Sequence, residues 1–139
     1  IEDAAGTAYA EASTDWSTAP DTVYAIGRDG AGRILYLTTS SAPTFVSAFD
    51  GTNASSSPTG TSMLNTPQGM ASTWGSALTA YSPATLLPDL TPAAYDGTMG
   101  STDIGIGNVS GGTSQWSGTI RRVKIYSNEK SDAEVLVLG

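Results

Sequence analysis

The sequence predicts a single all-β domain of the sandwich or barrel type. Three observations lead to this interpretation. Short segments of β-branched, aromatic or alternating residues recur along the chain, turn-forming residues separate them, and a helix signal lies at the C-terminal end. A chain of 139 residues can bury roughly two-thirds of its unfolded surface. Because residue 1 is not Met, we expect the domain, residues 1–139, to be part of a longer chain.

The closing strand carries the clearest pattern. Residues 118–126 are rich in β-branched and aromatic types, which favours a strand. Val123 and Ile125 share one face by the two-residue period, whereas Ile120 falls on the other. A β-bulge at the double arginine 121–122 would bring all three onto one face. The alternative is a strand that is buried on both faces.

A short helix is expected directly after this strand. Ser131, with Glu134 three residues later, forms a capping-box pattern, and an apolar run follows it. The pattern predicts a helix near residues 131–138. We expect Leu136 and its apolar neighbours to anchor this helix on the sheet.

The N-terminal half predicts four strands, at residues 7–12, 23–27, 33–39 and 44–49. In the first, Thr7, Tyr9 and Glu11 share one face and three alanines share the other. Asp29 and Gly30 predict a hairpin between the second and third strands, because Asp-Gly readily supplies positive φ.

Two stretches predict loops. Residues 54–67 are nearly all Ser, Thr, Gly, Asn and Pro apart from one Met and one Leu, and predict a long mobile loop without a core. Residues 82–92 contain three prolines, which excludes a central strand.

The remaining β patterns lie between and after these loops. Residues 70–74 and 77–81 predict a strand pair across Gly75-Ser76, and residues 103–107 predict a further strand. We expect Trp74 to lie in the core rather than to contact a ligand.

The closing segment resembles a known family. Gly-x-Ile-Arg-Arg-Val-x-Ile-Tyr, a turn of about four residues and Ser-Asp-Ala-Glu resemble the end of concanavalin A-like (laminin G-like) jelly-roll domains. The double arginine is similar to the version found in structural proteins of tailed bacteriophages. The resemblance is densest at residues 118–134. It continues more weakly upstream to about Thr7, and residues 82–92 depart from it, because the family usually has an Asn-Gly or Asp-Gly hairpin there.

The resemblance implies an antiparallel two-sheet jelly-roll sandwich with a short C-terminal helix. It also implies a non-enzymatic domain of a bacteriophage virion surface protein, in a head decoration, a head fibre or a tail fibre. The expected partners are other virion proteins and further copies of the chain, and the expected location is the particle surface.

Charge and composition exclude several functions. Six basic and thirteen acidic residues give a net charge of −7, which repels nucleic acids and anionic membrane surfaces. No apolar run approaches the roughly 20 residues of a membrane span. Without His or Cys, the chain cannot form Ser-His-Asp triads, cysteine nucleophiles or most zinc sites. Glucanases of this fold carry a Glu-x-Asp-x-x-Glu strand, which is absent, so we expect neither catalysis nor a cofactor.

The resemblance raises calcium binding as a further function, because several laminin G-like domains bind this ion through loop carboxylates. The candidates are Asp29, Asp50, Asp96 and Asp103. The first three each precede a Gly, so turn chemistry explains them, and no dense Asp-x-Asp spacing is present. We therefore expect no metal.

The alternative function is carbohydrate binding by a lectin-like module that recognises host surface glycans. Aromatic rings can stack on sugar rings, and Trp16, Tyr95 and Trp116 lie in expected loops. The structural alternative is that each of these rings only covers an end of the sandwich.

Overall fold

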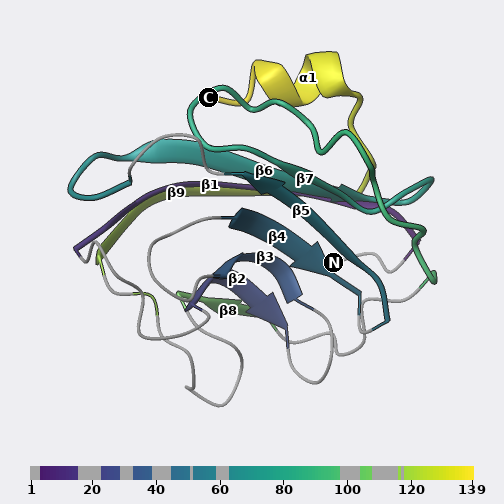
Figure 1. The fold of residues 1–139 in the computed structure, drawn as a ribbon, viewed down its shortest axis with the longest axis horizontal. Coiled ribbons are helices and arrows are strands. Elements are labelled where there is room, and N and C mark those ends of the chain that lie inside the picture. The colour runs from purple at the N-terminus through teal and green to yellow at the C-terminus, as the bar shows by residue number, and fades with distance from the viewer. Residues whose placement is uncertain are drawn as a thin grey trace.

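The computed structural model is a two-layer β-sandwich with a short helix outside one layer (Figure 1). It describes residues 4–15, 23–28, 33–38, 45–50, 52–58, 63–97, 104–107, 116 and 118–139. All strand pairs between these residues are antiparallel. The expected all-β sandwich with a C-terminal helix is therefore confirmed.

One layer is a four-stranded sheet of order β7-β6-β1-β9. Its strands are β1 (Gly6–Thr14), β6 (Gln68–Trp74), β7 (Thr79–Tyr81) and β9 (Gly118–Tyr126). The other layer is a five-stranded sheet of order β5-β4-β3-β2-β8. Its strands are β2 (Val23–Arg28), β3 (Arg33–Thr38), β4 (Phe45–Phe49), β5 (Ala54–Pro58) and β8 (Ile104–Ile106). The expected pairing of β2 with β3 is present, whereas the turn at residues 29–30 lies outside the described residues.

The closing strand contains the expected bulge. Glu11 of β1 pairs with Arg122 of β9, but the next residue of β1 pairs with Ile120, so Arg121 is the extra residue. Ile120 and Val123 both pack against the core between the sheets. The strand is therefore bulged, as its apolar pattern predicts, rather than buried on both faces.

The core between the sheets combines small residues on β1 with large ones on the strands around it. The alanines of β1 are fully buried beside Trp74 and Met70 of β6 and Ile26 of β2. A Cβ at Gly6 would overlap the Trp74 indole, so glycine is needed there. The prediction that Trp74 belongs to the core is confirmed.

The prediction of a loop at residues 54–67 is wrong for its first part, because Ala54–Pro58 forms the edge strand β5. This strand has few apolar side chains that could pack against the core. Hydrogen bonds of the Ser55 hydroxyl hold it in place instead. The hydroxyl accepts a hydrogen bond from the Ala80 N–H at 2.9 Å and donates to the Asp89 carboxylate at 2.8 Å. It thereby joins β5 to β7 of the other sheet. Met63, in the same expected loop, is fully buried.

The C-terminal helix α1 spans Asp132–Leu136 and is shorter than expected. Ser131 is its N-cap and forms the predicted capping box. Leu136 is 55% exposed, so the expectation that it anchors the helix is wrong. A five-residue helix turns only one side toward the sheet, and Val135 and Leu138 occupy that side. In the described part of the chain, no helix is long and apolar enough to span a membrane.

Candidate functional site

The outer face of the four-stranded sheet carries α1 (Figure 1). Strand register places the outward side chains of this face in three rows. The first row is Thr7, Thr73, Thr79 and Tyr126. The middle row is Tyr9, Ala71, Tyr81 and Lys124. The third row includes Glu11, Gly69 and Arg122.

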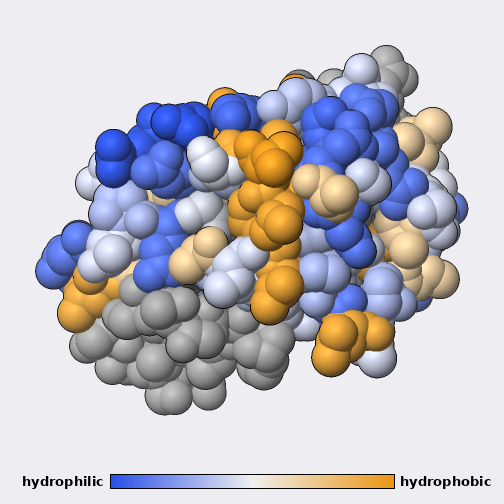
Figure 2. All heavy atoms as spheres, turned by 90° about the horizontal axis from the view of Figure 1, so that it is seen from above, coloured by the Kyte–Doolittle hydropathy of each residue, from blue (hydrophilic) through white to orange (hydrophobic). Residues whose placement is uncertain are grey.

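Helix α1 covers the middle row. Tyr9, Ala71 and Tyr81 form a buried cluster with Val135 and Leu138 of the C-terminal segment. This packing leaves a groove over the first row and another over the third. Figure 2 looks onto this face and shows an apolar stripe with hydrophilic surface on both sides of it.

The groove over the first row, which we call the β7–α1 groove, has a volume of about 440 Å³. Its floor consists of three nearly buried residues, Thr73, Thr79 and Tyr81. Its rim is polar and more exposed, and consists of Ser76, Glu129, Lys130, Ser131 and Asp132.

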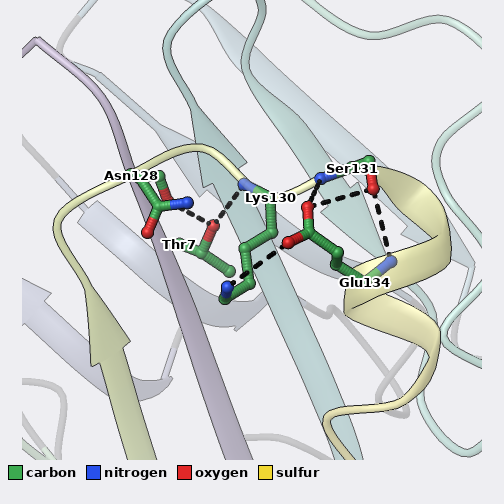
Figure 3. Close-up of polar contacts among 5 residues, drawn as sticks. All are labelled: Thr7, Asn128, Lys130, Ser131 and Glu134. Atoms are coloured by element: carbon green, nitrogen blue, oxygen red, sulfur yellow. Dashed lines mark hydrogen bonds and ion pairs between the residues drawn. The ribbon is translucent and has the colours of Figure 1, made fainter.

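Thr7 fixes the turn that carries much of this rim (Figure 3). Its hydroxyl donates to the Asn128 carbonyl at 2.9 Å and accepts from the Lys130 N–H at 2.9 Å. Both contacts bridge more than 120 residues of sequence. The first strand therefore holds the last turn of the chain in place, and the turn positions Glu129.

The Glu129 carboxylate is held on its other side by the β6–β7 turn. It accepts from the Ser76 N–H at 2.7 Å and from the Ser76 hydroxyl at 2.9 Å. Gly75 has φ +147°, and a Cβ there would lie 2.6 Å from the Glu129 carboxylate. Glycine is therefore required for the close approach of the two turns.

Tyr81 connects the floor of the groove to its rim. Its hydroxyl donates to Asp132 Oδ1 at 2.8 Å. The pKa of Tyr81 is raised to about 12, chiefly by burial; a hydrogen bond with Thr73 opposes this shift, and the hydrogen bond and charge of Asp132 add to it. Tyr81 therefore remains a neutral hydrogen-bond donor at physiological pH and orients Asp132.

Lys130 directs its charge toward the helix. Its ammonium lies 3.7 Å from Glu134 Oε1 and 4.5 Å from the centre of the Tyr126 ring. Glu134 also accepts from the Ser131 N–H at 2.9 Å. This backbone hydrogen bond, with a further one from the Ser131 hydroxyl, lowers the pKa of Glu134.

The second groove, over the third row, has a volume of about 410 Å³. It is lined partly by Tyr9, Glu11 and Arg122. Glu11 lies 3.3 Å from Arg121 and 3.8 Å from Arg122, so its charge is neutralised within the protein. Burial, followed by the Glu11 charge, raises the pKa of Tyr9. In the second groove, arginine therefore compensates the one acidic side chain of the lining.

The structure describes two of the three expected stacking residues, Tyr95 and Trp116, and does not bring these two together. Trp16 lies outside the described residues. Tyr95 and Trp116 are half-buried and pack against the core, and the Trp116 Nε1–H donates to the Ser13 carbonyl at 2.9 Å. Trp116 thus sits at the C-terminal end of β1. Tyr95 follows the bridge between Leu78 and Ala93, which lies at the opposite end of that sheet.

The calcium candidates divide in a similar way. Asp29 and Asp103 lie outside the described residues, whereas Asp50 and Asp96 are neighbours. The Asp50 carboxylate accepts from the N–H groups of Asn53 at 2.6 Å, Thr52 at 2.8 Å and Asp96 at 3.0 Å. These contacts use it as a turn-closing acceptor. Among the described residues, no group of three or more metal-ligating side chains occurs.

Sequence reasoning missed the β7–α1 groove. In the sequence, its residues fall in separate segments, as strand, turn and cap positions, and nothing local links them. One signal was available, because Glu129 and Asp132 flank the capping Ser131 and the capping box uses neither of them. Their convergence with β7 depends on contacts across 50 residues or more, which periodicity does not reveal.

The sequence matches no protein-family model and no curated protein. Several solved structures resemble the chain. A Bacteroides ovatus protein to which carbohydrate binding has been ascribed is 14% identical, with a TM-score of 0.69 over 97% of this chain. A Trypanosoma rangeli sialidase mutant displaying trans-sialidase activity is 20% identical, with a TM-score of 0.61 over 98% of this chain.

A second Trypanosoma rangeli sialidase structure, in complex with 2,3-difluoro-KDN, is 18% identical with a TM-score of 0.63. The chain spans 40% of the Bacteroides ovatus protein and 23% and 22% of the two sialidase chains. At such low identities these likenesses establish the fold alone. They show that the chain shares a β-sandwich fold with these proteins, and none of the three neighbours is a bacteriophage protein.

Proposed function

We propose that this chain is a non-catalytic carbohydrate-binding domain and that the β7–α1 groove holds the sugar. The observation that carries the proposal is the convergence of two carboxylates and two hydroxyls on the exposed rim of one groove: Glu129, Asp132, Ser76 and Ser131. Sugars present many hydroxyl groups, which donate to carboxylates and both donate to and accept from protein hydroxyls. The fold that the chain shares with the Bacteroides ovatus protein, to which carbohydrate binding has been ascribed, also supports this proposal.

The rim is pre-organised for binding. Ser76 fixes Glu129 and Tyr81 fixes Asp132 before any ligand arrives. A site whose side chains are already ordered loses less conformational entropy on binding than a mobile one. Each Glu129 oxygen keeps a second lone pair for a ligand hydroxyl.

The proposal includes binding without turnover, and two described carboxylates outside the groove lack the environment of a catalytic acid. Glycoside hydrolysis needs one carboxylic acid whose pKa is raised so that it can donate a proton. Asp50 and Asp89 have the opposite shift. Burial alone would raise the pKa of each, but hydrogen bonds to the carboxylates outweigh it and lower the pKa. We propose no cofactor.

A structural role on a bacteriophage virion surface is the second candidate. The Arg-Arg bulge supports it through its resemblance to phage proteins, and the arginine side chains are 57% and 48% exposed. Leu136 and Val137 are 55% and 78% exposed, so α1 offers apolar surface for packing against another copy of the chain. Binding of host glycans and assembly into a particle are compatible roles for one such domain.

A glycan array tests the primary proposal. The wild type should bind a defined set of glycans, and Asp132→Asn should weaken that binding about tenfold because it replaces a carboxylate acceptor. Asp15→Asn makes the same change at an exposed position at the end of β1, remote from the groove, and should bind like the wild type. Equal binding by Asp132→Asn and the wild type would reject the groove as the site.

The absence of binding to any glycan would favour the structural candidate. Sedimentation analysis then tests that candidate, with Leu136→Ser and Val137→Ser as variants. A wild-type oligomer that these variants dissociate would support packing through α1. A monomer at all concentrations would reject it.

A further inference from the structure

Resting on the proposed function, we infer that the β7–α1 groove selects neutral or amine-bearing sugars and rejects sugars that carry a carboxylate, such as sialic acid. The geometry that supports this is the position of Glu129 and Asp132 on the rim, next to Lys130, whose ammonium is paired with Glu134.

The charges that face the groove do not balance. Glu129 and Asp132 line it directly, and the Lys130 ammonium is paired with Glu134 and lies over the Tyr126 ring. Lys130 is only 17% exposed, so little of its charge is available to a ligand. Three carboxylates around one ammonium leave two net negative charges at this site.

The other described cations on this face, Lys124 and Arg122, are directed to partners outside the groove. Lys124 belongs to the middle row, and its ammonium donates to the Leu138 carbonyl at 2.8 Å. Arg122 belongs to the third row, on the other side of α1, and interacts with Glu11. Arg122 lies four residue steps along β9 from the first-row residue Tyr126, a distance of about 13 Å.

The hydrogen-bonding groups favour the same choice. The rim carboxylates only accept, so they pair with the hydroxyl or ammonium groups of a sugar. A sugar carboxylate would bring further acceptors and a like charge against Glu129 and Asp132. Repulsion of this kind is an effective way to reject a competing ligand.

This inference separates the chain from its sialidase neighbours, which share its fold. The binding of sialic acid by a Trypanosoma rangeli sialidase is a property of that protein. A shared fold does not determine the ligand, because the ligand is chosen by the charges of the site. Here those charges are negative.

Matched glycan pairs test the inference. N-acetyllactosamine and its sialylated form, and the neutral chitotetraose and its deacetylated, cationic form, are compared on one array. Neutral and cationic members should bind at least about tenfold more strongly than sialylated ones. Equal or stronger binding of the sialylated member would overturn this inference alone, whereas no binding to any glycan would overturn the proposed function itself.

Two isosteric variants and a change of salt show whether charge is the cause. Glu129→Gln and Asp132→Asn should each reduce the discrimination against the sialylated member several-fold, and Asp15→Asn should leave it unchanged. Raising the ionic strength from about 0.01 M to about 1 M shortens the Debye length from about 30 Å to about 3 Å and should also reduce it. Discrimination that neither the variants nor salt alters would arise from shape, and the inference would be wrong.

Discussion

The two faces of the four-stranded sheet are built from the same strands but have different compositions and covers. The inner face presents the β1 alanines and Trp74, which lie fully buried against the second sheet. The outer face presents Thr7, Tyr9 and Glu11 from the same strand, and α1 covers only its middle row. The two-residue period of a strand therefore places the core on one face of the sheet and the grooves on the other.

This difference predicts how each face responds to substitution. Changes on the inner face should lower the stability of the whole domain, because its residues pack against both sheets. Changes on the outer face should mainly affect α1 and the grooves. The following predictions test that contrast, from the largest expected effect to the smallest.

Trp74→Ala should lower the free energy of unfolding by about 3–5 kcal/mol, as expected for loss of a large buried aromatic side chain. Trp74 is fully buried in the inner core, so no other residue can fill the cavity without moving the sheets. Urea denaturation measures the loss. Tyr126→Ala, at a half-buried aromatic on the outer face, is the control and should cost clearly less. Equal losses would contradict the contrast between the faces.

Leu138→Ala should lower stability by about 2–5 kcal/mol, near the lower end of this range, because Leu138 is 6% exposed and packs in the outer cluster. Leu136→Ala removes the same atoms two residues earlier, at 55% exposure, and should change stability by no more than about 0.5 kcal/mol. Thermal unfolding of both variants gives the comparison. A larger loss for Leu136→Ala would mean that α1 packs by its other side.

The sequence predicts the closing segment well because its signals are local. The capping box needs only Ser131 and Glu134, and the bulge follows from the spacing of Ile120 and Val123. The alternation in β1 likewise depends on neighbouring residues alone. The fold class could therefore be inferred from short patterns.

The parts that sequence could not predict depend on long-range contacts. Strand β5 lacks β-forming residues, and its Ser55 is fixed by Ala80 and Asp89 from distant segments. The β7–α1 groove depends in the same way on contacts of Glu129 with Ser76 and of Asp132 with Tyr81. Composition reveals neither the strand nor the groove. Polar residues have the same composition in a loop as in an edge strand whose side chains are hydrogen-bonded to distant segments.

Stability should fall in acid partly through Asp50, on the side of the sandwich away from α1. Burial alone would raise the Asp50 pKa, but the hydrogen bonds to its carboxylate outweigh burial and hold the pKa below its ordinary 3.8 in the folded state. The unfolded state therefore binds a proton first as the pH falls, so the stabilisation is present above about pH 4 and is lost as the pH falls through the folded pKa.

Asp50→Asn should cost roughly 1–3 kcal/mol at neutral pH, because one amide oxygen cannot replace two carboxylate oxygens that accept several N–H groups. Its stability should also fall less steeply than that of the wild type below pH 4. Urea unfolding at a series of pH values measures both effects, with Asp15→Asn as a control for the change of charge. An unchanged pH slope would show that Asp50 contributes nothing to acid unfolding.

Ser131→Ala should have the smallest effect, about 1 kcal/mol, and it should be confined to the outer face. The substitution removes the hydroxyl that caps the Glu134 N–H, but it touches no residue of the inner core. Hydrogen exchange is the sharpest measurement, since the amides of α1 should exchange faster while those of β1 keep their protection. Ser131→Thr restores a capping hydroxyl and should recover most of the loss, and Ser127→Ala, at an exposed turn position, should have little effect. Faster exchange in β1 as well would mean that the two faces of the sheet are not energetically separate, and the contrast between them would fail.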